Sequence, residues 1–135
     1  GILANIKPAK LNPAKMKSRE ARSNTDIKQI QLALELYFDG QNHRYPIASA
    51  FCNANNNGLQ DLVDKGYIPE IPRDPLNPST CYQYTTPDDP TTYHLGATLE
   101  DSNNPNLKID KDFDSAAAGY YNGFYGADPI YDVTP

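Results

Sequence analysis

The sequence lacks the motifs that most often mark an enzyme. It has no Gly-x-Ser-x-Gly motif and no phosphate-binding loop, and its only histidines are His43 and His94. Neither histidine adjoins a cysteine, and the sequence favours no two of the carboxylates as an acid–base pair. These absences argue against catalysis, and we expect both histidines to have structural or surface roles.

A long apolar run is also missing. No stretch of about 18 or more apolar residues is present, so the sequence predicts no transmembrane helix. The chain opens with Gly1-Ile2-Leu3-Ala4, which has the character of the last turn of an apolar segment. An ordinary frayed terminus explains this opening equally well from composition alone.

Cysteine is scarce, with only Cys52 and Cys81 and no CxxC pair. A metal site built on these two residues is therefore poorly supported. Both lie in segments rich in Asn, Pro, Ser and Thr, and we predict a disulfide between them, which implies an oxidising compartment. The alternative is two unpaired small apolar residues. A bridge across this loop of roughly 30 residues would stabilise the fold by about 3–4 kcal/mol.

The formal net charge of the chain is −5, and the charged residues are unevenly distributed along it. Residues 1–22 carry six basic residues and one acidic residue, whereas the remainder carries six basic and sixteen acidic residues. A basic arm on an acidic body suits nucleic acid, anionic lipid or the acidic surface of a sister subunit. The overall acidity argues against a dedicated nucleic-acid binder, although the arm alone could hold nucleic acid weakly.

The clearest pattern that is present is a long helix between Asn12 and Asp39. Asn12-Pro13 suits an N-cap followed by a proline in the first turn, and Gly40 suits the end of the helix. Nothing interrupts the pattern from Ala14 to Asp39, which would span about 39 Å at 1.5 Å per residue. A monomeric domain of 135 residues rarely needs so long a helix.

The predicted helix has two apolar faces, whereas a helix packed only on its own domain needs one. The first face is expected to pack on the body and consists of Ile27, Ile30, Ala33, Leu34, Tyr37 and Phe38. The nearly opposite face is expected to be an assembly interface and consists of Leu11, Ala14, Ser18, Ala21, Thr25, Leu32 and Leu36. Residues 1–26 are therefore predicted to be a projecting basic half of the helix, and residues 27–135 the globular body of a single domain.

The remainder of the chain predicts a small sheet. Two strand patterns, at residues 81–86 and 92–99, flank a proline- and aspartate-rich turn that favours a hairpin, and residues 130–133 form a third strand pattern. A short helix near Leu59–Val63 precedes them. The expected fold class is α+β, with a long N-terminal helix packed on a small antiparallel sheet and a loop-rich C-terminal region.

Three segments together resemble one known family. Residues 33–46, with Tyr45-Pro46 at their end, resemble the end of the long helix in type IV pilin-like proteins. Residues 66–75 are similar to the segment that leads into that family's hairpin, and residues 1–4 resemble the end of the apolar helix that begins mature pilins. The chain is identified as most similar to the major pseudopilin of type II secretion systems, over residues 1–4 and 22–99.

The resemblance implies a structural subunit that polymerises into a filament and supports protein export. In that family a prepilin peptidase removes a leader and methylates the new N-terminus, and an apolar helix anchors the subunit in the membrane before assembly. The subunit would lie outside the cytoplasm, in the periplasm or in a cell-surface filament. Its partners would be further copies of itself, minor pilins or pseudopilins, and an inner-membrane assembly platform. The alternative is a surface type IV pilus subunit that acts in adhesion or DNA binding.

Because the first part of the family's apolar segment is absent, we expect this chain to be a soluble truncation. Lys7 and Lys10 depart from the family pattern in the region that follows.

An acidic stretch near the C-terminus is a candidate calcium site. Asp110, Asp112 and Asp114 stand at alternate positions, as carboxylates do at the start of an EF-hand loop, but the glycine and glutamate that complete such a loop are missing. Asp128 and Asp132 lie beyond a glycine-rich stretch that would let the chain fold around an ion. The alternative is a solvated acidic loop. The resembled family carries calcium in its C-terminal loop, which favours Ca²⁺ here.

Overall fold

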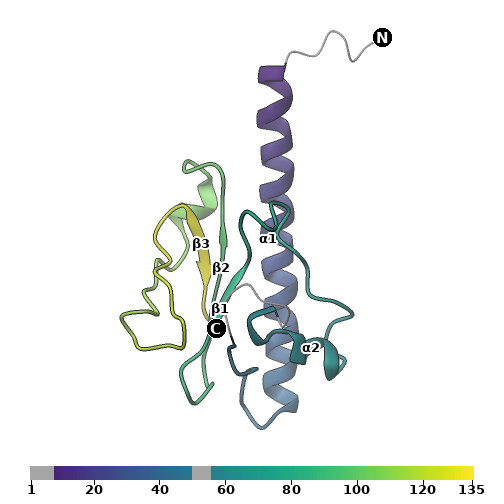
Figure 1. The fold of residues 1–135 in the computed structure, drawn as a ribbon, viewed down its shortest axis with the longest axis vertical. Coiled ribbons are helices and arrows are strands. Elements are labelled where there is room, and N and C mark those ends of the chain that lie inside the picture. The colour runs from purple at the N-terminus through teal and green to yellow at the C-terminus, as the bar shows by residue number, and fades with distance from the viewer. Residues whose placement is uncertain (1–7, 50–55) are drawn as a thin grey trace.

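A single long helix stands beside a small sheet in the computed structural model of the chain (Figure 1). The structure describes residues 8–49 and 56–135, with side chains from residue 12 onward in the first range. Helix α1 (Pro8–Gly40) has 33 residues, and its first turns extend beyond the body. Strands β1 (Gln83–Thr85), β2 (His94–Thr98) and β3 (Ile130–Val133) form one antiparallel sheet in the order β1-β2-β3. The predicted α+β fold is confirmed.

Helix α1 begins earlier than the sequence predicted. It starts at Pro8, so Asn12 is not its N-cap and Pro13 lies inside the helix. Pro8 suits the first helical position because its ring fixes φ and its missing N–H would have no partner there. Pro13 has no backbone N–H, so the helix lacks the one intrahelical hydrogen bond that this residue would donate. The predicted start was wrong because Pro8 and Pro13 both suit the first turn of a helix. The pair Asn12-Pro13 favoured Pro13, whereas the helix begins at Pro8.

The C-terminal end of α1 uses Gly40 for a different reason than predicted. Gly40 does not adopt the left-handed conformation; Asn42 and His43 do, with φ of 61° and 59°. The N–H of His43 donates to the carbonyl of Phe38 at 3.0 Å and closes the last turn. Gly40 instead lies against the end of the Tyr67 side chain, and a Cβ on residue 40 would require the Tyr67 hydroxyl to shift.

The core lies between α1 and the sheet. Ile27, Ile30 and Leu34 are fully buried on α1, as the sequence predicted, and Leu95 and Ala97 of β2 are fully buried opposite them. Each such aliphatic side chain contributes about 1.5–3 kcal/mol by its burial. Five tyrosines complete this core in a chain that has no tryptophan: Tyr37, Tyr45, Tyr82, Tyr84 and Tyr93.

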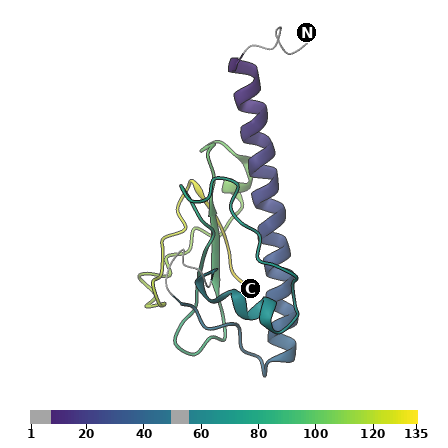
Figure 2. The same ribbon diagram turned by 45° about the vertical axis from the view of Figure 1, so that its right-hand side comes forward.

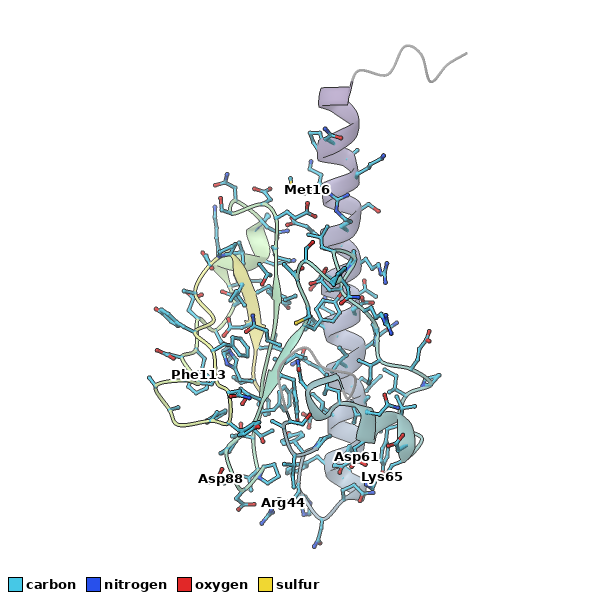
Figure 3. All side chains as sticks on the ribbon, viewed as in Figure 1. Met16, Arg44, Asp61, Lys65, Asp88 and Phe113 are labelled. Atoms are coloured by element: carbon cyan, nitrogen blue, oxygen red, sulfur yellow. The ribbon has the colours of Figure 1, made fainter. Side chains whose placement is uncertain are left out.

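Shorter elements cover the lower part of α1. The 3₁₀ turn η2 (Asn56–Gly58) leads into helix α2 (Gln60–Asp64), and Asp61 and Lys65 lie beside the C-terminal half of α1 (Figure 3). Tyr37 of α1 donates a hydrogen bond of 2.5 Å to Asp61, which attaches α2 to the helix. A further 3₁₀ turn, η3 (Pro105–Lys108), lies in the connection between β2 and β3.

Candidate functional site

The face of α1 opposite the core is uncovered. Six of the seven residues predicted to form an assembly interface are exposed, and they are Ala14, Ser18, Ala21, Thr25, Leu32 and Leu36. Leu32 is 64% and Leu36 48% exposed, although both are large and apolar. The side chain of Leu11 lies outside the described residues. Figures 1 and 2 show the sheet on one side of α1 only, so the helix has one buried and one free face.

A groove runs along one edge of this free face. It has a volume of about 710 Å³ and lies between α1 and the extended segment of residues 67–73. Leu32 and Leu36 form part of its wall on α1, and Ile68 and Ile71 line it on the other side. The predicted interface is therefore continuous with a recessed apolar surface.

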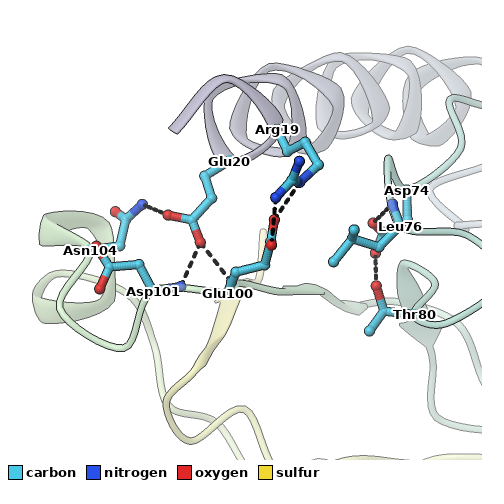
Figure 4. A network of polar contacts seen from close by, with 8 residues as sticks. All are labelled: Arg19, Glu20, Asp74, Leu76, Thr80, Glu100, Asp101 and Asn104. Carbon is cyan, nitrogen blue, oxygen red and sulfur yellow. Dashed lines mark hydrogen bonds and ion pairs between the residues drawn. The ribbon is translucent and has the colours of Figure 1, made fainter. Parts of the chain in front are cut away.

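The body makes contact with α1 further toward its N-terminus than predicted. The guanidinium of Arg19 donates two hydrogen bonds, of 2.7 and 2.8 Å, to the carboxylate of Glu100. Glu20 is buried, and its carboxylate accepts hydrogen bonds from the backbone N–H groups of Glu100 and Asp101 at 2.6 and 2.9 Å, and from the side-chain amide of Asn104 at 2.9 Å (Figure 4). The part of α1 that stands free of the body thus ends near Ser18 and not at residue 26.

This contact was missed because polar residues make it. The sequence-based boundary followed the first apolar residue of the buried face, Ile27. Glu20 and Ser23 share that face and are 6% and 5% exposed, so the burial extends two turns further than the apolar pattern does.

We expect Glu20→Ala to destabilise the protein by about 2–4 kcal/mol, because it leaves two buried backbone N–H groups and an amide without their acceptor. Glu20→Gln, which keeps one acceptor oxygen, should cost less. Chemical denaturation measures the loss, and amide exchange should show Glu100 and Asp101 losing protection. The control Lys17→Ala, at an exposed neighbouring position, should change stability by at most about 0.5 kcal/mol.

Three of the five predicted calcium ligands come together in the C-terminal loops. Asp110, Asp112 and Asp128 each offer a carboxylate oxygen, and these oxygens lie within 4.8 Å of one another. The Oδ1 atom of Asp110 is buried and has no hydrogen-bond partner among the described residues. Burial, together with the charges of Asp132, Asp112 and Asp128, raises the pKa of Asp110 to about 6. The three carboxylates therefore form a site of concentrated negative charge.

The other two predicted ligands have different partners. Asp114 accepts a hydrogen bond from the N–H of Ala117 at 3.0 Å and pairs with Tyr125 in an isolated bridge. Asp132 is fully buried on β3, and its carboxylate accepts hydrogen bonds from the N–H groups of Asp112 and Phe113 at 2.8 and 2.9 Å. Asp132 thus supports the loop that carries Asp110 and Asp112, while the full set of five ligands stays a prediction.

A buried histidine connects this loop to the sheet. His94 on β2 is fully buried, with Nε2 2.7 Å from Asp132 Oδ2 and Nδ1 2.7 Å from Ser115 Oγ. Its ring stacks on Phe124 with a centroid distance of 3.9 Å, and Phe113 packs edge-on against it at 5.0 Å. Burial opposes ionisation of Asp132, but the hydrogen bonds from His94 and the two backbone N–H groups outweigh it and lower the pKa of Asp132.

The Ser115–His94–Asp132 arrangement resembles a nucleophile–base–acid triad in its residue types, but its geometry is structural. All three residues are fully buried, and Ser115 Oγ also contacts the backbone of Phe124 as donor and as acceptor. A nucleophile needs access to its substrate, and this hydroxyl has none. No local sequence pattern links these three residues, because strand pairing and a loop bring them together.

The predicted disulfide falls partly outside the described chain. Cys52 lies in residues 50–55, which the structure does not describe, and Cys81 is not a free thiol. The pairing therefore stays a prediction. Within the described residues, no helix combines the length and the apolar character needed to cross a membrane.

Comparison with known proteins gives one match. The family model described as type II secretion system (T2SS), protein G, matches residues 10–115. This range includes nearly all of α1, strands β1 and β2, and the acidic loop as far as Ser115. No curated protein and no solved structure matches the chain.

Proposed function

The chain belongs to the family of type II secretion system protein G, the major pseudopilin, and from this premise we propose that the free face of α1 is the surface through which its subunits assemble. The family is one of structural filament subunits that act in protein export outside the cytoplasm. The function is thus mechanical: helices associate in a shared core, and the acidic bodies form the outer wall.

The observation that carries the proposal is the pair of faces on α1. One face is fully buried at Ile27, Ile30 and Leu34, so the helix needs no further contact for its own fold. The other face leaves Leu32 and Leu36 64% and 48% exposed, and covering this apolar surface with a partner would favour association. Small residues at Ala14, Ser18 and Ala21 would allow two helix backbones to approach closely.

Other parts of the proposal follow from the family. Subunits would be anchored in the inner membrane through an apolar N-terminal segment, processed and methylated by a prepilin peptidase, and added to the filament by an inner-membrane platform with minor pseudopilins. No observation on the described residues favours the alternative of a surface pilus subunit in adhesion or DNA binding.

Deleting the gene in the source strain separates these two functions. For a secretion pseudopilin, export of type II secreted proteins should be lost while surface pili persist. Loss of surface pili with normal export would contradict the proposal and support the pilus alternative.

The acidic loop is proposed to bind one Ca²⁺ through Asp110, Asp112 and Asp128. Their carboxylates fit a hard cation, since calcium prefers oxygen ligands and commonly takes several aspartates. The buried and unpartnered Oδ1 of Asp110 is the atom that most needs such a partner. When bound, the ion would offset the mutual repulsion of the three carboxylates. Asp132 would hold the backbone of Asp112 and Phe113 in place, as it does in this structure.

We expect Ca²⁺ to raise the melting temperature of the chelator-treated protein. At 100 times the dissociation constant the stabilisation would be about 2.7 kcal/mol. Asp128→Asn should abolish this shift, whereas Asp88→Asn, at an exposed aspartate away from the site, should retain it. Calorimetric titration with Ca²⁺ gives the affinity, and the absence of any effect at millimolar Ca²⁺ would rule the site out.

A further inference from the structure

One imidazole lies between strand β3 and the loop that carries the acidic residues. His94 of β2 is fully buried, and each of its two ring nitrogens has a polar partner. Nε2 lies 2.7 Å from Oδ2 of Asp132, and Nδ1 lies 2.7 Å from Oγ of Ser115. Both partners are fully buried as well, so water does not compete for either contact. The ring therefore joins β3 to the loop that contains Ser115.

Asp132 connects this ring to the candidate calcium ligands. Its Oδ1 accepts a hydrogen bond from the N–H of Asp112 at 2.8 Å, and its Oδ2 accepts one from the N–H of Phe113 at 2.9 Å. The backbone N–H of Asp132 donates to Oδ2 of Asp110 at 3.2 Å. Asp132 thus contacts two of the three carboxylate residues that converge, Asp110 and Asp112, and it is not one of the three itself.

The backbone of Asp112 depends on this support. Its φ is 48°, in the left-handed region that residues other than glycine uncommonly adopt. Such a conformation persists only where the surrounding contacts fix it, and here the N–H of Asp112 is held by Asp132. If that acceptor moved, Asp112 would relax to a commoner conformation. Its carboxylate would then leave those of Asp110 and Asp128.

The position of the Asp132 carboxylate in turn depends on His94. The ring is held by aromatic packing, since it stacks on Phe124 with 3.9 Å between centroids and 7° between planes. The edge of the ring system is closed by Phe113, whose centroid lies 5.0 Å away. Gly126 leaves room for the carboxylate, because a Cβ at that position would lie 2.2 Å from Oδ2 of Asp132. A rigid ring in a fixed place therefore presents Nε2 to this oxygen.

We infer that His94 is a positioning residue of the proposed calcium site. Its Nε2 orients the carboxylate of Asp132, and Asp132 fixes the backbone of Asp112. The carboxylate of Asp112 is thereby kept beside those of Asp110 and Asp128. The inference rests on the proposed binding of Ca²⁺ and adds to it the residue that arranges the ligands. Ligands arranged in this way need less reordering when the ion binds, which raises the affinity.

Two amide substitutions of His94 separate this role from a merely structural one. The amide of glutamine stands at the same bond separation from Cβ as Nε2, whereas the amide of asparagine stands at the separation of Nδ1. His94→Gln therefore keeps a donor for Asp132 and loses the contact with Ser115, and His94→Asn does the reverse. Both variants lose the ring and its stacking on Phe124, so both should be less stable than the unsubstituted protein without Ca²⁺.

Calorimetric titration of the chelator-treated proteins with Ca²⁺ measures the dissociation constants, in a stabilising osmolyte that favours the folded state of every variant. His94→Asn should bind Ca²⁺ at least about tenfold more weakly, as expected when an outer partner of a metal site is removed. His94→Gln should bind with nearly the affinity of the unsubstituted protein, because a donor to Asp132 remains. Ser115→Ala, which removes only the partner of Nδ1, should also retain the affinity.

Equal dissociation constants for His94→Asn and His94→Gln would overturn the inference, and so would a loss of about tenfold in Ser115→Ala. Either result would leave the proposed calcium site in place, because the unsubstituted protein would still bind the ion. Absence of binding by the unsubstituted protein would instead contradict the site itself. If His94→Asn does not fold, His94→Gln still decides, because loss of Ca²⁺ binding by this variant in its folded state would overturn the inference.

Discussion

Replacing Ala21 with glutamate should abolish filament assembly while the unassembled protein stays folded. Ala21 is exposed on the free face of α1, and glutamate is nearly as good a helix former as alanine, so stability should change by at most about 0.5 kcal/mol. In a helix–helix contact the same carboxylate would lose its water without gaining a partner, which costs several kcal/mol per contact. Repeated along a filament, this cost prevents assembly.

Electron microscopy of filaments and thermal unfolding of the unassembled protein measure the two parts of this prediction separately. Ala118→Glu is the matched control, since it places the same side chain at an exposed alanine in the C-terminal loop and should leave assembly intact. If Ala21→Glu unfolds the domain, the separation of α1 into a core face and a free face is wrong.

Asp132→Ala should destabilise the domain by about 3–5 kcal/mol, because three buried hydrogen-bond donors lose their acceptor at a cost of roughly 1–3 kcal/mol each. The carboxylate of Asp132 accepts hydrogen bonds from His94 and from the N–H groups of Asp112 and Phe113, and all three donors would be left without it. Asp132→Asn should cost less because one acceptor oxygen remains. Denaturation in the presence of chelator measures this effect apart from any bound calcium.

The control for this variant is Asp89→Ala. Asp89 pairs with Arg44 at 2.6 Å, but its side chain is 68% exposed. A pair at this exposure contributes about 0–1 kcal/mol. If the Asp132 and Asp89 variants lose the same stability, the buried network does not hold the C-terminal loop on the sheet.

The sequence predicted those features that depend on local periodicity. The core face of α1 was predicted from the spacing of Ile27, Ile30 and Leu34, and all three are fully buried. The strand patterns placed β1, β2 and β3 correctly, although each strand is shorter than or equal to the predicted segment. These features could be predicted because a repeat of 3.6 or 2 residues is written in the sequence itself.

Features that depend on contacts between distant segments were missed or assigned wrongly. The role of Gly40 depends on Tyr67, and the burial of Glu20 depends on the backbone of Glu100 and Asp101. Neither partner could be identified from the local sequence. One feature of the sequence could have indicated that Glu20 is buried, because Glu20 lies on the same face of α1 as Ile27.

The acidic loop was predicted only in part, because its residues follow a local pattern while their partners lie on distant segments. Alternate aspartates correctly pointed to a cluster, and Asp110, Asp112 and Asp128 do converge. Sequence alone could not separate these three from Asp132, whose place on β3 beside His94 turns its carboxylate toward backbone donors. The residue types in the sequence suggested a cation site. Only the register of the sheet determined which of the carboxylates lie together in it.

The central claim is that assembly covers the free face of α1, and thiol labelling tests it most directly. Ala21→Cys would be reacted with a maleimide before and after filament assembly, with Thr91→Cys in an exposed turn of the body as a control. Position 21 should react freely in the unassembled protein and at least about tenfold more slowly in filaments, while position 91 should react at comparable rates in both. Equal reactivity of position 21 in the two states would contradict the claim.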